Sequence, residues 1–395
     1  MSTPSQPTQS VTEVSNTSWF SRLGSSLKGL FIAVLILFVA VVALFWNENR
    51  AVATYQSLKE GASLVISANP AEINPENEGK LIHFSGEART PAILSDVEFG
   101  INQTGLRLRR VVEVYQWSEN STSTTVEKLG GGQETTTSYT YEKKWSEPLI
   151  DSTQFKEVAS HENPTAKPYD TQEWLANPVS VGKVAIPDFL LRSLAQYQAI
   201  PLSAEVIQTL PYAKQENLEV FGDHIYYRTE DPTQPEIGNI RIRYEIVPLG
   251  QISVIAKQQG ETLAPYQTKQ GRSLSMSKVG IFSAEEMFDA AISNNQMMTN
   301  VLRVLGVFMI FVALNMLLAP LKILASFVPF IGRIVGSISM FVSALVAICL
   351  GVIVIALAWL AARPLMAIGL LIFAGGIIGA LVYIRSAAAK NKSKK

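Results

Sequence analysis

The sequence predicts an α+β membrane protein with four transmembrane helices, one near the N-terminus and three near the C-terminus. A large β-rich extracytoplasmic domain lies between the first and the second helix. Only 17% of the 395 residues are charged and 48% are hydrophobic, whereas an ordinary soluble domain has ~25% charged residues. The apolar residues gather near the two ends of the chain, and the stretch between them alternates apolar and polar residues as strands do.

The first predicted span is residues 29–46, GLFIAVLILFVAVVALFW. This uncharged run approaches the roughly 20 residues that a helix needs to cross the hydrocarbon core. It lacks a small-residue cleavage site and a polar segment follows at once, so we interpret it as a retained anchor rather than a signal peptide. The preceding residues 1–28 are expected to form a disordered cytoplasmic tail, because the first 18 are rich in Ser, Thr, Gln and Pro.

Residues 47–303 form the predicted extracytoplasmic domain with its helical connectors. The polar segment after Trp46 is expected to prolong the first helix until Pro70 and Pro75 end it. A further helix is expected at 187–198, and Ser283 and Glu286 form a capping box for a helix that runs into the second span. Alternation predicts strands at the following ranges, of which the second and third form a hairpin around a triple-glycine turn: 81–86, 106–119, 137–145, 179–186, 224–228, 239–247 and 252–258.

The C-terminal apolar region, residues 304–384, is predicted to be a three-helix bundle with spans at 304–319, 337–362 and 364–384, followed by a basic tail at 385–395. Between the first two of these spans lies PLKILASFVPFIGRIVG, which is apolar but interrupted by Pro320, Pro329 and Gly332. This segment is either re-entrant or interfacial, or an apolar loop packed on the bundle.

The distribution of Lys and Arg near the helix ends predicts the topology. Both tails should be cytoplasmic, with residues 47–303 in the periplasm or a lumen. The basic residues on the cytoplasmic side would be Arg22, Lys28, Lys322, Arg333, Arg385, Lys390, Lys392, Lys394 and Lys395, against Arg50, Lys59, Arg303 and Arg363 on the other. The lysine-rich end is also expected to contact anionic lipid.

The residues that enzymes and metal sites use are scarce. Cys349 is the only cysteine and the three histidines fit no metal-ligand spacing. The sequence has no nucleophile elbow and no phosphate-binding loop, so we expect no catalytic residue, no metal and no cofactor. We interpret Glu78 and His83 as a turn acid and an exposed strand residue, not as an acid–base pair. The formal net charge of zero gives no attraction to nucleic acid.

Two sets of residues are candidates for contacts of other kinds. Glycines at i and i+4 allow helices to approach closely, either within the bundle or between protomers, although such spacing also arises by chance; these candidates are Gly332, Gly336, Gly375 and Gly379. The candidate interaction surface for lipid or for acidic groups of a partner consists of Glu76, Glu78, Arg107, Arg109 and Arg110. The alternatives are a solvated face for the arginines and turn capping for the glutamates.

Several blocks resemble the transmembrane protein 43 family, also called LUMA. They are PENEGKLIHFSG, LRRVVEVYQWSE, PEIGNIRI, FSAEEMF and WLAARPLMA, and they occur in the family's order over nearly the whole chain. The resemblance implies four spans, a large lumenal or periplasmic domain related to OB-fold barrels, self-association and no established enzymatic activity. In animals it implies the endoplasmic reticulum and inner nuclear membrane, with links to lamins and emerin. A pattern of proline, glutamate and glycine precedes both predicted strands 81–86 and 239–247. It indicates either two related barrels or a coincidence.

The sequence departs from the animal pattern in the N-terminal tail and in residues 116–137, so partner contacts there are not transferred. Sequons stand at Asn102 and Asn120, but without other eukaryotic targeting signals we expect a bacterial member in the cytoplasmic membrane, the alternative being the endoplasmic reticulum and inner nuclear membrane.

The main hypothesis from the sequence is a non-enzymatic membrane scaffold that self-associates and organises membrane or envelope protein complexes. Its expected partners are membrane lipid, further copies of the chain and other membrane or envelope proteins, with no nucleic acid. Two alternatives stay open: a membrane-bound enzyme or transporter component acting on lipid or envelope polymer, and a membrane stress sensor.

Overall fold

The structure is a computed structural model that describes residues 9–205 and 217–360, together with seven isolated positions between 365 and 379. It divides into two compact units: residues 1–13, 59–122 and 137–288 form the first, and residues 14–58, 123–136 and 289–395 the second.

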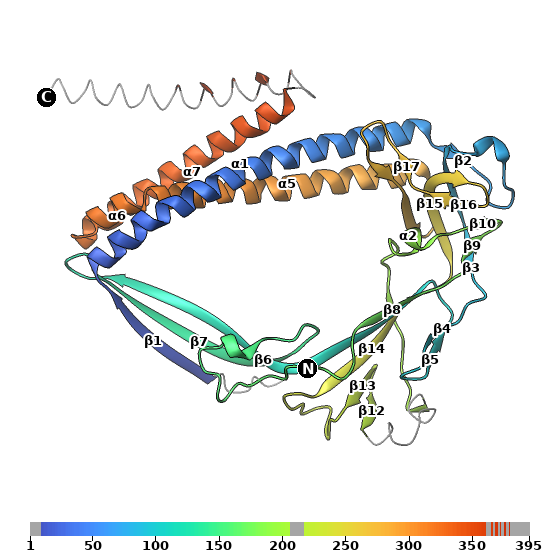
Figure 1. Cartoon of the computed structure of the whole chain (residues 1–395), viewed down its shortest axis with the longest axis horizontal. Helices are drawn as coiled ribbons and strands as arrows, with labels where there is room; N and C mark the ends of the chain where they lie inside the picture. The colour runs from blue at the N-terminus through green and yellow to red at the C-terminus, as the bar shows by residue number, and fades with distance from the viewer. Residues whose placement is uncertain are drawn as a thin grey trace. The chain divides into compact units, whose positions relative to one another are not determined.

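Figure 1 labels the elements along the chain. The helices are α1 Trp19–Leu64, η1 Pro75–Asn77, η2 Ser152–Gln154, α2 Asp188–Leu191, α5 Ala284–Leu317, α6 Ala319–Ala325 and α7 Pro329–Trp359. The strands are β1 Gln9–Thr17, β2 Ile66–Ser67, β3 Leu81–Arg89, β4 Leu94–Asp96, β5 Ile101–Gln103, β6 Arg107–Glu127, β7 Gln133–Ser146, β8 Gln172–Leu175, β9 Ser180–Val181, β10 Val184–Ala185, β11 Gln198–Ala199, β12 Leu218–Phe221, β13 His224–Tyr227, β14 Ile240–Val247, β15 Gln251–Gln259, β16 Thr262–Ala264, β17 Tyr266–Gln267, β18 Ser273–Leu274 and β19 Met276–Val279.

One sheet of the first unit curves into a nearly closed barrel. Its strands follow the order β10-β9-β3-β15-β16, and β3 pairs antiparallel with β15 from Leu81 opposite Lys257 to Glu87 opposite Gln251. The two end strands meet, because the amide of Ala185 donates to the carbonyl of Glu261 at 2.8 Å. Closure of this kind leaves few exposed strand edges for pairing with other chains.

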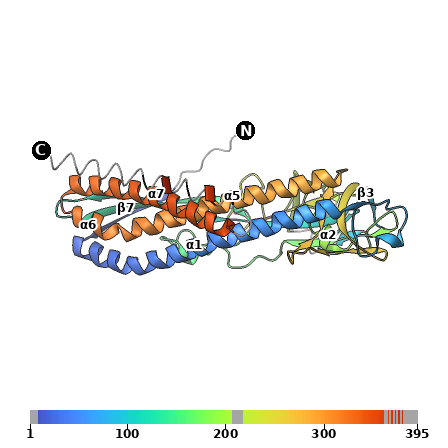
Figure 2. The ribbon, with the colours of Figure 1, turned by 90° about the horizontal axis from the view of Figure 1, so that it is seen from above.

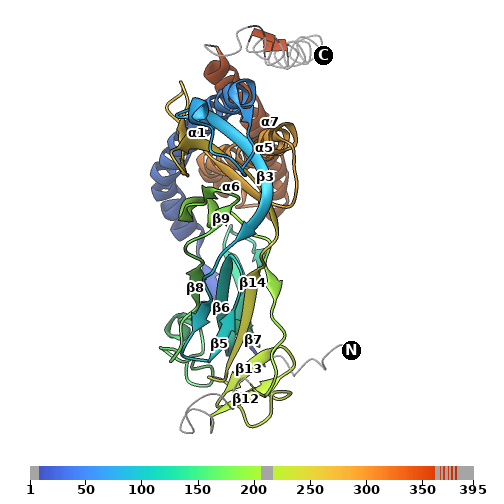
Figure 3. The same cartoon turned by 90° about the vertical axis from the view of Figure 1, so that its right-hand side faces the viewer.

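The second sheet has the path β1-β7-β6-β14-β13-β12. Strands β6 and β14 are antiparallel neighbours (Figure 3), and Val112 of β6 pairs with Ile242 of β14. Alternate residues of both sheets turn inward to one apolar core that includes Phe84, Val112, Tyr244 and Val254. The predicted hairpin is thus confirmed, although β6 and β7 are longer than expected.

In the second unit the three long helices α1, α5 and α7 lie side by side (Figures 1 and 2). Their shared core includes Ala40, Leu44, Ile310, Ala347 and Val354. All three are long and apolar enough to cross a membrane. The first three predicted spans therefore correspond to α1, α5 and α7.

The two predicted connectors are continuous helices. Helix α1 has 46 residues and extends 18 residues beyond Trp46, a total length of about 69 Å. Helix α5 begins with the predicted capping box, in which the amide of Ser283 donates to Glu286 at 2.7 Å and the amide of Glu286 donates to the Ser283 hydroxyl at 3.2 Å. The second span follows without a break.

Several local expectations were wrong. The helix expected at 187–198 is only the four-residue α2, because the chain then turns so that β11 can pair with β14. Instead of disorder, residues 9–17 form β1 beside β7, and α1 begins ten residues before the predicted span. Residues 179–186 form two short strands joined by a turn at Gly182, which has a φ of 58°.

The segment between the second and third spans is helical and not an irregular loop, and its re-entrant or interfacial placement stays a prediction. It consists of the short helix α6, after which α7 begins at Pro329, so that Gly332 lies within a helix. Proline at the first helical position is favourable because its missing N–H would have no intrahelical partner there. The predicted fourth span, residues 364–384, and the basic tail, residues 385–395, lie almost wholly outside the described residues.

The tip of the β6–β7 hairpin belongs to the second unit. Arg22 at the start of α1 donates to Glu127 at 3.1 Å and to the carbonyl of Gly131 at 2.5 Å. The predicted topology places Arg22 and Glu127 on opposite sides of the membrane. If α1 crosses a bilayer, the contact between Arg22 and Glu127 and the predicted topology therefore cannot both be present.

Candidate membrane-interface site

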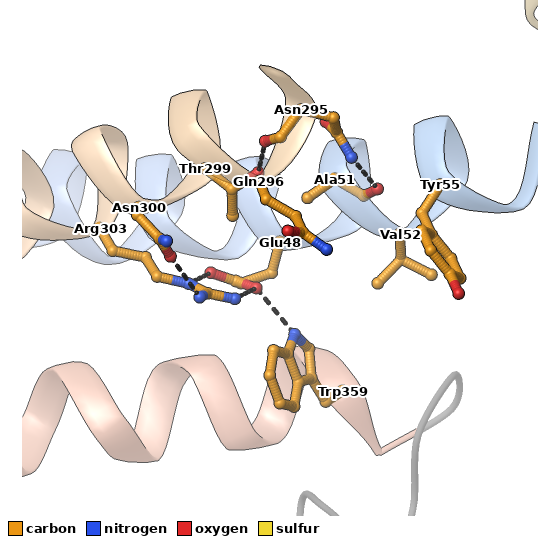
Figure 4. A pocket seen from close by; sticks show the side chains of 10 residues that line it. All are labelled: Glu48, Ala51, Val52, Tyr55, Asn295, Gln296, Thr299, Asn300, Arg303 and Trp359. Carbon is orange, nitrogen blue, oxygen red and sulfur yellow. Dashed lines mark hydrogen bonds and ion pairs between the residues drawn. The ribbon is translucent and has the colours of Figure 1, made fainter. Parts of the chain in front are cut away.

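A buried carboxylate joins three helices in the second unit. Glu48 of α1 is fully buried and accepts from Arg303 of α5 through Nε at 2.6 Å and Nη2 at 2.8 Å. The indole Nε1 of Trp359, on the last turn of α7, donates to the same carboxylate at 2.7 Å (Figure 4). The Arg303 guanidinium also lies 5.3 Å from the centre of the Trp359 ring. We call these three residues the interface clamp.

A second layer of polar contacts connects α1 to α5 beside the clamp. The side-chain amide of Asn47 donates to the backbone carbonyl of Thr299 at 3.2 Å. The side-chain amide of Asn295 donates to the backbone carbonyl of Ala51 at 3.0 Å. Arg50 donates to Asn47 at 3.2 Å and to the Thr299 hydroxyl at 3.3 Å. Hydrogen bonds of this kind hold helices in a fixed register where apolar contacts alone allow sliding.

The clamp forms one side of a pocket of about 230 Å³. Glu48 and Arg303 stand where the uncharged runs of α1 and α5 end, because Glu48 follows Trp46 by two residues and Arg303 directly precedes Val304. We therefore expect the pocket to lie at the level of the lipid headgroups. Its lining residues are Glu48, Ala51, Val52, Tyr55, Asn295, Gln296, Thr299, Asn300, Arg303 and Trp359 (Figure 4).

The clamp has the geometry of a structural tie and not of an acid–base centre. Both Glu48 oxygens accept charge-assisted hydrogen bonds, which are stronger than neutral ones. A general base needs an oxygen free to take a proton from a substrate. Within the described part of the chain, no group of three or more His, Cys, Asp or Glu side chains is placed to hold a metal ion.

The structure separates the three arginines of the predicted interaction surface. Arg107 and Arg110 are buried: Arg107 pairs with Glu173, and Arg110 pairs with Asp96 and Glu98 at 2.8 Å each. Only Arg109 is substantially exposed, near Glu147 at 3.3 Å. Arg107 and Arg110 therefore cannot form a docking surface, because each is turned inward toward acids that the alternation of β6 did not reveal.

These buried pairs hold the β-rich unit together. The hydroxyl of Tyr244 donates to Asp96 at 2.6 Å, and burial together with this hydrogen bond raises the pKa of Tyr244. Burial favours the neutral form of Glu173, but hydrogen bonds from Tyr197 and Arg107 outweigh it and lower the pKa of Glu173. Burial and the bond to Glu173 raise the pKa of Tyr197 to about 12.

Around the first turn, Glu78 and His83 have structural roles. Glu76 is exposed in η1, which the side chain of Asn74 caps, and Glu78 accepts from the amide of Gly260 at 2.8 Å. His83 was expected to be exposed but is 9% exposed. Its Nε2 donates to the carbonyl of Phe282 at 2.9 Å, so it anchors the start of α5 to β3. Glu78 and His83 share no contact.

The other two histidines are also engaged with neighbours. His161 is fully buried and stacks on Tyr141 with ring centres 3.7 Å apart. His224 lies 2.7 Å from Asp223. The Nδ1 atom of His161 also lies 3.2 Å from the Ser160 hydroxyl and 3.0 Å from the carbonyl of Glu157.

Different glycines from the predicted ones bring the spans together. A Cβ at Gly306 of α5 would lie 2.5 Å from the Leu44 side chain of α1, and one at Gly351 of α7 would lie 2.6 Å from Val307 of α5. A Cβ at Gly332 would meet Ser326 at 2.7 Å and Glu127 Oε2 at 3.2 Å, neither of which belongs to another span, while Gly336, Gly375 and Gly379 face open space. The last three stay candidates for contacts between protomers.

Sequence reasoning missed Glu48 and Trp359. Their signals were present: an acid two residues after an apolar span, an arginine directly before another and a tryptophan near the end of a third. An acid and an arginine at the same membrane level are expected to pair, since unpaired charges are costly there.

Together, the fold and the site define a multi-pass membrane protein in which a β-rich domain is joined to a helical bundle by two continuous helices. A family model described as "Transmembrane protein 43" matches residues 114–364. The chain belongs to the transmembrane protein 43 family, as the sequence blocks had indicated.

Named relatives agree with this assignment. The chain is 32% identical over 372 residues to "Transmembrane protein 43" of Mus musculus, covering 90% of each chain. It is 31% identical over 365 residues to the Homo sapiens protein of that name, covering 90% of this chain and 89% of the relative. A Drosophila melanogaster homolog is 27% identical over 346 residues, covering 86% and 90%. These names state no activity. No solved structure matches the chain.

Proposed function

We propose that this chain is a non-enzymatic membrane scaffold that self-associates through its spans and organises membrane or envelope proteins around its β-rich domain. The observation that carries the proposal is the interface clamp. The two charged groups beside the pocket, which a substrate could otherwise use, are occupied by bonds within the chain.

The exposed face of α7 offers an apolar surface to a partner. Along α7 the exposed large side chains include Ile338, Met340 and Phe341, and Gly336 lies open among them. Small residues on a lipid-facing helix favour close helix approach. A second copy of α7 is the partner that we expect at this face, with lipid elsewhere.

The proposal keeps the topology in which both tails are cytoplasmic and residues 47–303 lie on the opposite side. Under that topology the contact of Arg22 with Glu127 is broken when α1 spans the bilayer, because ~30 Å of hydrocarbon separates the two residues. The membrane is proposed to be the bacterial cytoplasmic membrane.

Crosslinking in the native membrane tests self-association. Gly336→Cys in a Cys349→Ala background is expected to form a disulfide-linked dimer on mild oxidation. The matched control is Ser339→Cys, since Ser339 is 7% exposed and faces its own chain. If neither oxidation at position 336 nor an amine-reactive crosslinker produces an oligomer, self-association is wrong.

A sensor is a second candidate function, and the continuity of α1 and α5 favours it. A helix without a break can transmit a displacement from one end to the other. Under the scaffold proposal, the separation between a probe near the end of α1 and a probe near the start of α5 stays constant when lipid composition changes. A changed separation would favour the sensor.

A further inference from the structure

The outer edge of β7 already accepts a partner strand in the structure. Strand β7 lies between β6 and β1, and among the described residues β1 is the strand that covers this outer edge (Figure 1). The side chains agree with this pairing, since the hydroxyl of Tyr139 on β7 donates to Glu13 on β1 at 3.5 Å. The edge of β7 is therefore able to pair with an added strand.

The proposed topology removes β1 from this edge. Strand β1 ends at Thr17, and α1 begins at Trp19. When α1 spans the bilayer, β1 is cytoplasmic and β7 lies on the opposite side, with ~30 Å of hydrocarbon between them. In that state β1 cannot pair with β7, and the outer edge of β7 is left open to another strand.

The sequence of β7 favours pairing with a further strand. Natural edge strands use proline, lysine and other charged residues to prevent such contacts. Residues 135–141, TTTSYTY, contain none of these. Threonine and tyrosine are also enriched in strands. An open edge of this composition is a template for another chain.

The hydrogen bonds of the hairpin show which residues of β7 point to the outer edge. The amide of Lys128 donates to the carbonyl of Gly132 at 2.8 Å within the hairpin, whereas the amide of Tyr115 on β6 donates away from β7, to the carbonyl of Asn239 at 2.9 Å. Hydrogen-bonded pairs alternate along an antiparallel ladder. The even-numbered residues of β7 thus bond to β6, and the odd-numbered residues direct their N–H and C=O groups outward.

A second β7 fits this edge in an antiparallel register centred on Tyr139. The two Tyr139 residues then form a hydrogen-bonded pair, and Glu134 of each copy stands opposite Lys144 of the other. Opposite charges in directly opposed positions stabilise a strand pair. A register centred on Ser138 would instead place Glu134 opposite Glu142, and like charges in this position are unfavourable.

The two charged residues are accessible to a partner. Glu134 contacts Lys128 of its own hairpin at 2.5 Å, with the two side chains 36% and 51% exposed. Surface pairs of this kind contribute little to stability and can be exchanged. Lys144 is exposed. The charge pattern of β7 therefore favours a second copy of the same strand as its partner.

We propose that, in the topology given above, the outer edge of β7 pairs antiparallel with β7 of a second copy of the chain. The same patch serves on both copies, as in other two-fold interfaces. This pairing adds a contact between two β-rich units to the contact proposed between spans. It rests on the proposed topology but does not depend on Gly336.

Directed disulfide formation in lipid nanodiscs tests the register. Two differently tagged copies of the full chain, both with Cys349→Ala, carry Glu134→Cys in one and Lys144→Cys in the other. Mild oxidation is expected to link the two tags, because opposed residues of an antiparallel pair have Cα atoms about 4.5–5.5 Å apart. Lys143→Cys in place of Lys144→Cys is the matched control. It should link roughly tenfold less, since neighbouring residues point to opposite faces of a strand.

A further variant tests whether β1 still covers the edge. Glu13→Cys and Tyr139→Cys are combined in one chain with Cys349→Ala, and no disulfide within the chain is expected. Such a disulfide, or equal linking by positions 143 and 144, would overturn the proposal. Linking at position 336 without linking between 134 and 144 would leave self-association through the spans intact and rule out only the pairing of β7.

Charge reversal gives a measurement without cysteines. In a Gly336→Val background, which removes the proposed contact between spans, we expect part of the chain to remain dimeric in nanodiscs. Lys144→Glu should weaken this dimer roughly tenfold, because it places like charges opposite each other twice. Adding Glu134→Lys restores opposite charges and should recover the dimer. A dimer that is unaffected by Lys144→Glu, or not recovered by the second reversal, would contradict the register.

Discussion

At the scale of single residues, Glu48 illustrates how a membrane protein keeps a charge at the bilayer boundary. Its carboxylate is fully buried, and three donors from two other helices surround it. The desolvation of such a pair can equal its attraction, so the clamp specifies a geometry more than it adds stability. What it prevents is the sliding of α1, α5 and α7 past one another.

Breaking the clamp on one side should be costly. Glu48→Ala leaves Arg303 and Trp359 without their acceptor and is expected to lower the free energy of unfolding by about 3 kcal/mol, measured by denaturation in nanodiscs. Glu219→Ala is the control, because Glu219 is exposed. The double variant Glu48→Leu with Arg303→Leu should recover much of the loss; a double variant as unstable as Glu48→Ala would contradict this account.

Two histidines predict how stability depends on pH. Burial lowers the pKa of His83 and of His224 below 6.5, although a hydrogen bond to Phe282 and the charge of Asp223, respectively, act in the opposite direction. Above pH 6.5 both groups are neutral in either state. As pH falls below 6.5 the unfolded chain takes up protons that the folded chain does not, so stability declines.

The measurement is the midpoint of thermal unfolding at pH 7.5 and at 5.5. We expect a lower midpoint at the acidic value and a smaller difference in the double variant His83→Gln with His224→Gln. The glutamine amide introduced in place of His83 does not titrate and can still donate to the carbonyl of Phe282. An unchanged difference in the double variant would show that other groups set the dependence.

At the scale of elements, close helix packing depends on glycines that a side chain of a neighbouring helix contacts. Gly306→Val would place carbon atoms within the volume of Leu44 and is expected to cost about 1–3 kcal/mol. Gly336→Val meets open space and should leave the free energy of unfolding nearly unchanged. Equal effects of the two substitutions on unfolding would contradict the packing of α1 against α5.

The sequence predicted those parts of the fold that depend on local interactions. The continuous helices, the capping box and the β6–β7 hairpin depend on periodicity and on nearby residues, and they were predicted correctly. The partners of Arg107 and Arg110 are 66 and 14 residues away, and those of Glu48 are 255 and 311 residues away. Such pairing is set by tertiary packing and leaves no local pattern.

At the scale of the whole molecule, topology decides whether the hairpin tip can contact the start of α1. Leu129 at the tip is 89% exposed. With Cys349→Ala as background, Leu129→Cys should react with an impermeant maleimide from outside intact cells, and Ser25→Cys only after permeabilisation. Labelling of both positions from one side would favour the contact between Arg22 and Glu127 over the proposed topology.

The central claim, a scaffold that self-associates through its spans, is tested most directly by the mass of the protein in lipid nanodiscs. We predict a dimer or larger oligomer for the unmodified chain and a shift toward monomer for Gly336→Val with unfolding unchanged. A protein that is strictly monomeric in nanodiscs and in mild detergent would contradict the claim.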